Sequence, residues 1–247
     1  MKKMTIAGMF CAALTFTATA GEFYRLDLSE LAPGTALVKT NAAGKSAALR
    51  PTWGMWPRTP DKAGVKVVER DGVKALEIQP GFQINTSEWS VAQNDAQQSV
   101  IYCRFRLMLP ELAGKGVVGS LRLQQANNRT AAFIGFEPKG AAFDILAGNG
   151  DGKGGVNWQK AGRVEPGKWF TVDIKLDFNT KTFDVAVDGR NWETGKNFRH
   201  ASNWVGTMWP ENLKDRSYRY DIEAGTALPV LVSEAAFSAD PFPEAKQ

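Results

Sequence analysis

The 247-residue sequence has few of the residues that carry metal or thiol chemistry, with two cysteines and one histidine. Structural and catalytic zinc sites use several such ligands, so the composition excludes a zinc centre of this kind. Cys11 lies in the N-terminal segment described below, which leaves Cys103 alone in the rest of the chain. A single cysteine cannot form an internal disulfide, so the fold must depend on its hydrophobic core.

Charge of one sign and long apolar runs are also scarce. The formal net charge is +4, of which Lys2 and Lys3 contribute two units, and lysine and arginine do not cluster in one segment. A cationic stripe that follows a phosphate backbone is therefore missing, and we expect no nucleic-acid partner. Beyond the N-terminus, no segment holds the roughly 18 apolar residues of a membrane helix, so no membrane span is predicted.

The N-terminal segment has the three parts of a secretory signal peptide. Lys2 and Lys3 precede a short apolar stretch over 6–16, and the small residues Ala18-Thr19-Ala20 follow. We therefore predict that residues 1–20 are a signal peptide, that residues 21–247 form one mature domain, and that the protein is secreted or periplasmic. A lipoprotein signal acylated at Cys11 is the alternative, although the residues before it do not resemble such a site.

Apolar residues recur with a period of two along most of the remaining chain. Such alternation predicts strands at 24–28, 65–70, 73–79, 99–109, 117–123, 131–137, 141–146, 169–177, 183–188, 218–223 and 230–237. Asp71-Gly72 predicts a tight hairpin, and Pro166-Gly167 a type II turn. Cys103 falls on the apolar side of its strand, so we expect it to be buried. Short strands separated by turns predict an all-β, two-sheet antiparallel jelly-roll sandwich.

The segment 165–189 resembles a hairpin of a known superfamily. Gly167-Lys168-Trp169 opens a strand that ends at Asp177, and the next strand ends in Asp188-Gly189. This pattern, with the segments 104–111 and 132–136, is similar to the concanavalin A-like lectin/glucanase superfamily and its LamG-like jelly-roll domains. The resemblance implies the sandwich fold and a buried Trp169. Because that superfamily contains lectins, adhesion modules, hydrolases and lyases, activity has to be argued from the site.

No catalytic constellation of the superfamily is recognisable in the sequence. Glycoside hydrolysis needs two carboxylates about 5 Å or about 6.5–9.5 Å apart. Asp173, Asp177, Asp184 and Asp188 are interpreted as the polar face of a hairpin. The motifs of alginate lyases are missing, and the single His200, with the tyrosines and arginines of 216–220, is only a weak lyase candidate. We therefore expect no enzymatic activity, without excluding a lyase or hydrolase.

A cofactor is likewise not expected, although calcium is considered at one loop. The segment 149–155 is rich in glycine and contains Asn149 and Asp151, which offer oxygen ligands. It has one carboxylate, a lysine and no closing glutamate, so a flexible hairpin loop is the preferred interpretation. No metal ligands are assigned.

Two long segments, 32–64 and 189–215, lack strand alternation and contain five of the eight tryptophans. Long structureless loops in compact domains are often functional, and aromatic rings stack on the apolar faces of sugars. Each segment contains Met-Trp-Pro with a second tryptophan just upstream. The predicted ligand-binding residues are Trp53, Trp56, Arg58, Trp204, Trp209 and Asn212. Plugs at the ends of the sandwich are the alternative role of these tryptophans.

These observations favour an exported, non-catalytic, lectin-like domain whose partner is a polysaccharide or another glycan. A structural or protein-interaction domain of the cell envelope, with a protein partner, is one alternative. A polysaccharide-degrading glycoside hydrolase or lyase is the other.

The leader prediction is tested by the intact mass of the exported protein. We expect a chain that begins at Gly21 and carries one thiol, because Cys11 is removed with residues 1–20. The thiol of Cys103 should react with a thiol reagent only after denaturation. A mass that retains residues 1–20, or that includes a lipid on Cys11, would contradict the prediction.

Overall fold

The computed structural model of the protein describes residues 21–37, 53–56, 64–86, 89–90, 100–125, 130–201 and 217–243. The elements in these ranges are strands, and they form two antiparallel sheets that pack face to face. The predicted two-sheet antiparallel jelly-roll sandwich is thus confirmed. Among the described residues, no helix is long and apolar enough to cross a membrane.

The nine-stranded sheet, here called sheet A, contains both the longest predicted hairpin and the last strand of the chain. Its order is β15 (Arg190–Asn197), β14 (Thr182–Val187), β13 (Trp169–Asp177), β8 (Val100–Met108), β17 (Val230–Ser238), β5 (Val73–Ile78), β4 (Val65–Arg70) and β2 (Ala36–Leu37), and β1 (Glu22–Arg25) also pairs with β17. The Asp71-Gly72 hairpin forms as predicted, with φ of 53° and 72° at its two residues.

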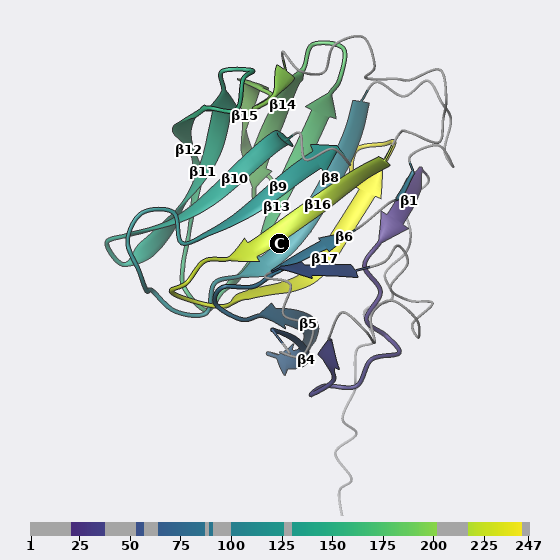
Figure 1. Cartoon of the computed structure of the whole chain (residues 1–247), viewed down its shortest axis with the longest axis vertical. Coiled ribbons are helices and arrows are strands. Elements are labelled where there is room, and N and C mark those ends of the chain that lie inside the picture. The colour runs from purple at the N-terminus through teal and green to yellow at the C-terminus, as the bar shows by residue number, and fades with distance from the viewer. Residues whose placement is uncertain are drawn as a thin grey trace, which may run out of the picture.

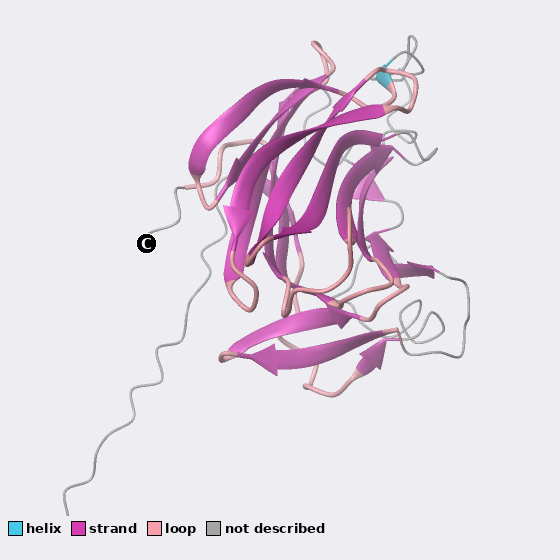
Figure 2. Ribbon diagram, turned by 90° about the vertical axis from the view of Figure 1, so that its left-hand side faces the viewer, coloured by secondary structure: helices cyan, strands magenta, loops and turns pink. Residues whose placement is uncertain are grey.

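The eight-stranded sheet, sheet B, lies in front of sheet A in Figure 1. Its order is β12 (Val156–Val164), β11 (Ala142–Gly150), β10 (Thr130–Lys139), β9 (Gly119–Gln125), β16 (Ser217–Ala224), β6 (Gln83–Thr86) and β3 (Trp53–Trp56), and β7 (Trp89–Ser90) also pairs with β16. Figure 2 shows the curvature of the strands and the β4–β5 hairpin at the lower end. β12 and β3 are therefore at opposite edges of sheet B.

The apolar faces of the two sheets form one continuous core. On β8, Ile101, Cys103, Phe105 and Leu107 point inward and are at most 1% exposed. Burial also raises the pKa of the Cys103 thiol, so the sequence-based placement of this cysteine in the core is confirmed. The alternation that identified β8 arises because adjacent side chains on a strand point to opposite faces.

An aromatic cluster joins the two sheets near the middle of this core. Tyr220 of β16 packs edge-on against Phe105 at 5.4 Å between ring centroids and stacks with Phe237 at 5.9 Å. Its hydroxyl oxygen lies 3.0 Å from that of Tyr24 in β1, and the two groups share a hydrogen bond. Burial raises the pKa of both phenols above its usual range, which favours their neutral, hydrogen-bonded forms.

Six strands lie where the sequence predicted irregular chain or no strand. β2 and β3 lie within 32–64, β15 lies within 189–215, and no strand was predicted at β6, β7 or β12. One of these corrections concerns Trp53 and Trp56, which are the end residues of β3 and pair with Thr86 and Gln83 of β6. β2, β3, β12 and β15 are at sheet edges, where a strand does not need a strictly alternating apolar face, and β6 and β7 are short.

The position of Trp169 also differs from the prediction. The next residue, Phe170, occupies the core, where it is 3% exposed and packs edge-on against Phe136 of sheet B. Trp169 is half-buried on the outer face of sheet A, where it packs against a small cluster that contains Met108 and Leu231. The predicted turn at Pro166-Gly167 forms, with φ of 71° at Gly167, but the inward residue after it is the phenylalanine.

This correction changes the expected effects of two substitutions. Phe170→Ala should lower the free energy of unfolding by about 3–5 kcal/mol, because it removes a core aromatic ring. Trp169→Ala should cost only about 1–2 kcal/mol, since part of the indole is already in water. Urea denaturation of both variants measures the difference. An equal or larger loss for Trp169→Ala would show that the tryptophan, not Phe170, anchors this turn.

Candidate functional site

Polar side chains occupy the outer face of sheet B at its centre. On β9, Arg122 and Gln124 alternate with the core residues Leu121 and Leu123. On the neighbouring strand β16, Asp221 pairs in register with Arg122, and Glu223 follows two residues later on the same face. Strands that are about a hundred residues apart in the chain thus place two carboxylates beside one guanidinium.

Arg122 is the centre of this polar group. Its Nη2 donates to Oε1 of Gln83 at 3.0 Å and lies 3.2 Å from Oε2 of Glu223 and 3.7 Å from Oδ2 of Asp221. Asp221 is 2% exposed and also accepts a hydrogen bond from Nε2 of Gln124 at 2.5 Å. A buried carboxylate needs such partners, because an uncompensated buried charge is strongly destabilising.

Beside the polar group lies an aromatic surface formed by β10 and β12. Phe133, the register partner of Arg122, contacts Trp158 with 4.9 Å between ring centroids. The indole of Trp158 lies close over Gly135 and Gly148, where an added Cβ atom would come within 3.2 and 3.3 Å of its ring. Glycine in these two strands therefore makes room for a large ring to lie across the sheet.

A third group, Arg199, reaches this surface from the segment after β15. Its guanidinium carbon lies 4.9 Å from the ring centroid of Phe133, within the range of a cation–π contact, and its Nε donates to the carbonyl of Gly154 at 2.6 Å. Burial, followed by the positive charge of Arg122, lowers the pKa of Arg199. Arg122, Phe133, Trp158, Arg199, Asp221 and Glu223 are hereafter called the sheet B site.

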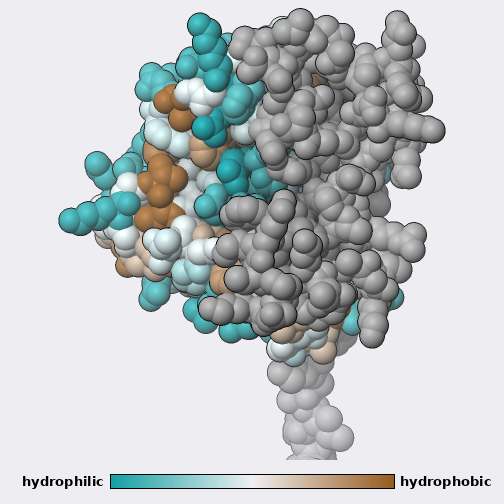
Figure 3. Space-filling model, viewed as in Figure 1, coloured by the Kyte–Doolittle hydropathy of each residue, from teal (hydrophilic) through white to brown (hydrophobic). Residues whose placement is uncertain are grey.

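The described part of this face combines hydrophobic and hydrophilic surface. In Figure 3, brown and teal side chains adjoin one another on the left of the view. Val117, which contacts the position of Gly135 next to Trp158, is 40% exposed and contributes apolar area. Apolar area with a few convergent polar groups is typical of sites that bind small organic or sugar ligands.

His200 lies next to this surface but is held by the backbone. The amide of Thr130 donates to its Nδ1 at 3.0 Å, and its own amide donates to the carbonyl of Thr130 at 3.2 Å. Because a backbone amide can only donate, Nδ1 must be the acceptor and is not available as a base at that nitrogen. The geometry thus gives His200 a role in joining the segment 198–200 to β10.

Asp221 and Glu223 form a carboxylate pair that the sequence analysis did not select. Their spacing at alternate positions of one strand places both on one face, as a hydrolase requires. Glycoside hydrolysis uses one carboxyl group as a proton donor. Here both carboxylates contact the same guanidinium, and Asp221 is almost fully buried, which is the arrangement of an ion-pair network.

The hairpin aspartates considered in the sequence have structural roles. Asp173 is 6% exposed and accepts two hydrogen bonds from Arg104, at 2.6 and 3.0 Å. Asp188 accepts from the amide of Thr171 and Asp184 from the amide of Gly195. These contacts occupy the carboxylates within sheet A.

The calcium loop considered in the sequence is closed by its own backbone. Oδ1 of Asp151 accepts from the amides of Lys153 at 2.7 Å and Gly155 at 2.9 Å. These hydrogen bonds, first that of Lys153, lower the pKa of Asp151. Within the described ranges, no group of three histidine, cysteine, aspartate or glutamate residues is placed to hold a metal ion.

The ligand-binding residues predicted from the sequence are only in part within the described structure. Trp53 and Trp56 lie on the edge strand β3, and Trp56 pairs with Gln83, whose side chain contacts Arg122. Arg58, Trp204, Trp209 and Asn212 lie outside the described residues. Whether the two Met-Trp-Pro motifs form one surface thus stays a prediction.

Trp158 was missed because it is the outward residue of an edge strand with little buried surface. Its strand has mostly exposed and half-buried side chains, so the alternation that marks a core strand is weak there. The available signal was the pair Gly135 and Gly148, since isolated glycine within strands indicates close approach of another group.

Comparisons with known proteins identify the fold only. No described protein family matches the sequence, and no protein of curated function does. A carbohydrate esterase of the Shiga toxin-encoding bacteriophage phi24B superposes with a TM-score of 0.51 at 14% identity, over 76% of this chain and 90% of the esterase. A sialidase superposes with a TM-score of 0.50 at 11% identity, over 83% of this chain and 18% of the sialidase. An alginate lyase of Pseudomonas aeruginosa gives a TM-score of 0.46 at 9% identity, over 70% and 85% of the two chains.

The network around Asp221 predicts unequal effects for two arginines of sheet B. Arg122→Met should lower the free energy of unfolding by about 2–3 kcal/mol, because it leaves the buried Asp221 without its cation. Arg163→Met is the matched control: it removes an ion pair to Asp144 in which the arginine side chain is 47% exposed, and should cost under about 1 kcal/mol. Chemical denaturation measures both, and equal costs would contradict the assigned role of Arg122.

Proposed function

We propose that this protein is a non-catalytic glycan-binding domain and that the sheet B site contacts the sugar. The observation that carries the proposal is the indole of Trp158, which lies across two glycines beside Phe133 and next to a group of arginine and carboxylate side chains. Sugars present both apolar ring faces and hydroxyl edges, so a flat ring bordered by hydrogen-bonding groups suits them.

The surface is held in place before any ligand arrives. Trp158 is supported by Phe133, Phe133 by Arg199, and Arg199 by the carbonyl of Gly154. Groups that are already ordered lose less conformational entropy on binding, which favours affinity. Arg122 and Glu223 supply a donor and a partly exposed acceptor beside these rings, since the carboxylate of Glu223 is 44% exposed.

The predicted tryptophans extend this proposal across the sheet. Trp158 is on the edge strand β12, and Trp53 and Trp56 are on the opposite edge strand β3. Six strand intervals of about 4.8 Å separate these edges, a span of roughly 29 Å. A ligand that used both edges would be an oligosaccharide or polysaccharide that crosses the strands, with Arg58, Trp204, Trp209 and Asn212 as further proposed contacts.

The named neighbours support this ligand class. Two of the solved structures that superpose on this chain, with TM-scores of 0.51 and 0.50, are a carbohydrate esterase and a sialidase. Membership of the concanavalin A-like superfamily, with a LamG-like domain over 21–247, is part of the proposal and rests on the hairpin motif of 165–189 together with the sandwich fold. Export to the periplasm or medium, proposed from residues 1–20, would bring the domain into contact with extracellular or envelope glycans.

Glycan binding is tested with Trp158→Ala and a matched control. Affinity electrophoresis in gels that contain soluble β-glucan, xylan, pectin or alginate should show retardation of the parent. Trp158→Ala should lose at least about 1 kcal/mol of binding, a fivefold to tenfold weakening, because it removes a stacking ring. Trp192→Ala, which removes a 46% exposed tryptophan from sheet A, should bind as the parent does.

The same gels, together with melting temperatures, test whether the Met-Trp-Pro motifs contribute to the ligand surface. Trp56→Ala and Trp209→Ala should weaken binding with near-parental melting temperatures if the Met-Trp-Pro motifs share the ligand surface. Severe destabilisation by both would instead support their role as plugs of the sandwich. Retardation of no polysaccharide by the parent protein would overturn the proposed function and favour a structural or protein-binding role in the cell envelope.

Polysaccharide cleavage is the second candidate, because Asp221 and Glu223 lie on one face of β16. Release of reducing ends or of unsaturated products from the same polysaccharides would support it. Glu223→Gln should then abolish product release. Retardation in gels should weaken only slightly, because the amide oxygen of glutamine can still accept a hydrogen bond from the sugar. Retardation without product release supports the binding domain.

A further inference from the structure

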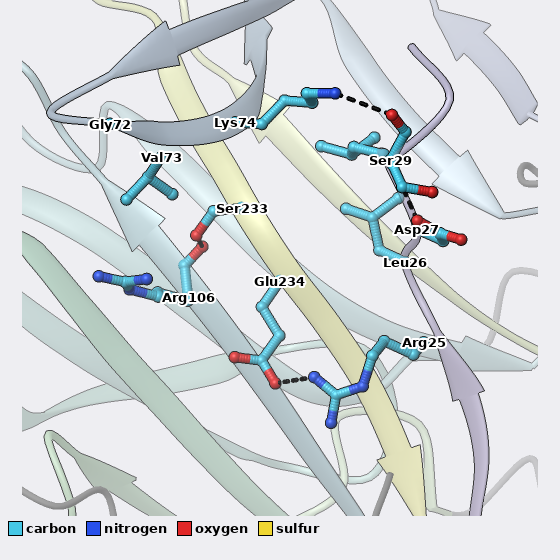
Figure 4. Close-up of a pocket in the computed structure, with 11 residues that line it drawn as sticks. Arg25, Leu26, Asp27, Ser29, Gly72, Val73, Lys74, Arg106, Ser233 and Glu234 are labelled. Carbon is cyan, nitrogen blue, oxygen red and sulfur yellow. Dashed lines mark hydrogen bonds and ion pairs between the residues drawn. The ribbon is translucent and has the colours of Figure 1, made fainter. Parts of the chain in front are cut away.

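A pocket lies on the outer face of sheet A. It lies where β5 and β1 pair, one after the other, with the same edge of β17 and leave a gap between them. β5 pairs with Val230–Val232, and β1 pairs with the later part of β17 up to Ser238. The amide of Leu26 donates to the carbonyl of Ala235 at 2.7 Å and continues the pairing of β1 by one residue. Between these two regions, Ser233 and Glu234 form the floor of the gap, and Figure 4 shows the strands that border it.

A β-bulge shapes the floor of this pocket. The register of β17 against β8 shifts between Val232 and Glu234, so Ser233 is an extra residue in the ladder. Bulges re-aim side chains and are frequent beside functional sites. Here the bulge directs the hydroxyl of Ser233 toward the carbonyl of Arg106, at 3.4 Å, and both side chains line the pocket.

The pocket has the size and walls of a small-molecule site. Its volume is about 670 Å³, within the range of roughly 300–1,000 Å³ that such sites occupy. Leu26 and Val73 approach it from opposite sides in Figure 4, one from the segment after β1 and the other from the β4–β5 hairpin. Leu28 adds a third apolar side chain to the lining. Leu26 and Leu28 are each 6% exposed and belong to the core, so a ligand with an apolar body would cover mainly the half-buried side chain of Val73.

The carboxylates of the pocket already have partners. Oε1 of Glu234 is 2.5 Å from Nη1 of Arg25. Oδ1 of Asp27 accepts from the amide of Ser29 at 2.8 Å, and Nζ of Lys74 donates to the carbonyl of Ser29 at 3.0 Å. The hydrogen bond from Ser29, followed by smaller effects that include the charge of Lys74, lowers the pKa of Asp27. Each acid thus has a partner of its own in the fold, although Arg25, the partner of Glu234, also pairs with Glu22.

Arg106 is the arginine of the pocket lining that has no acidic partner among the described residues, whereas Nζ of Lys74 is held by a backbone carbonyl. Its register partner on β17 is Glu234, but that carboxylate binds Arg25 instead. Across the other edge of β8 it pairs with Thr171, which carries no charge. Throughout the described residues, no carboxylate forms an ion pair with Arg106. Its guanidinium carbon lies 5.3 Å from the centroid of the Trp169 ring. In the described part of the chain, Arg106 is therefore a half-buried guanidinium without a carboxylate partner at the wall of the pocket.

We propose that this pocket binds a small organic monocarboxylate, with the carboxylate on Arg106 and the apolar body between Leu26 and Val73. A guanidinium presents two parallel N–H groups that match the two oxygens of a carboxylate. A single negative charge suits Arg106, whereas a dianion would bring a second charge close to Glu234 and Asp27. The site is on the sheet opposite the sheet B site, so the proposal stands or fails independently of glycan binding.

Sodium hexanoate is the test ligand, and hexan-1-ol is its uncharged counterpart. Titration into the ¹⁵N-labelled full mature protein, followed by amide shifts, should show saturable binding of hexanoate that moves the amides of 72–74, 106 and 233–234. Hexan-1-ol should bind at least tenfold more weakly. Arg106→Gln should weaken hexanoate binding at least tenfold and leave hexan-1-ol unaffected, because only the charge contact is lost.

Matched variants keep the test independent of stability. Arg70→Gln removes an exposed arginine from β4 of the same sheet and should change the hexanoate affinity less than twofold. Val73→Trp fills the pocket while the Arg106 side chain is retained, and should abolish binding of both ligands. The proposal is overturned if hexanoate does not bind saturably, if binding survives both Arg106→Gln and Val73→Trp, or if hexyl phosphate binds more tightly than hexanoate.

Discussion

Burial of the apolar faces of the two sheets against each other is the constraint on which the rest of this structure depends. Its centre is the cluster of Phe105, Phe237, Tyr220 and Tyr24, which joins three strands of sheet A to β16 of sheet B. Two phenol groups in this core would be costly if unpaired, and their mutual hydrogen bond removes that cost. The bond also fixes how β1 and β16 face each other, which plain hydrocarbon packing would leave less specific.

The same packing fixes both outer faces. Because strand residues alternate, Tyr220 and Ile222 cannot occupy the core without placing Asp221 and Glu223 on the outer face of sheet B. Likewise, Phe105 and Leu107 in the core place Arg104 and Arg106 on the outer face of sheet A. A register slip of one residue would bury charges and expose the aromatic cluster, so the core specifies the chemistry of the surface.

Sequence alternation revealed the strands that have one buried face, and it failed where that face is small. β8 and β13 were predictable within a residue or two, and the predicted bounds of β13 are those of the structure. The edge strands β12 and β15 were not, since neither buries a regular apolar row. The sheet B site was also not predictable, because the contact of Arg122 with Asp221 depends on the pairing of β9 with β16, which no local pattern encodes.

Arg104 and Arg106 show how far the partner of a charge is decided by pairing across strands. They are two residues apart on β8, point to the same face and are chemically identical. Arg104 is opposite Asp173 and forms a two-point contact with it, whereas Arg106 is opposite Thr171 and Glu234. Glu234 is drawn to Arg25 because β1 brings that arginine onto the far side of β17. That Arg106 has no carboxylate partner among the described residues is therefore a consequence of strand order, since it requires β1, β17, β8 and β13 to lie side by side.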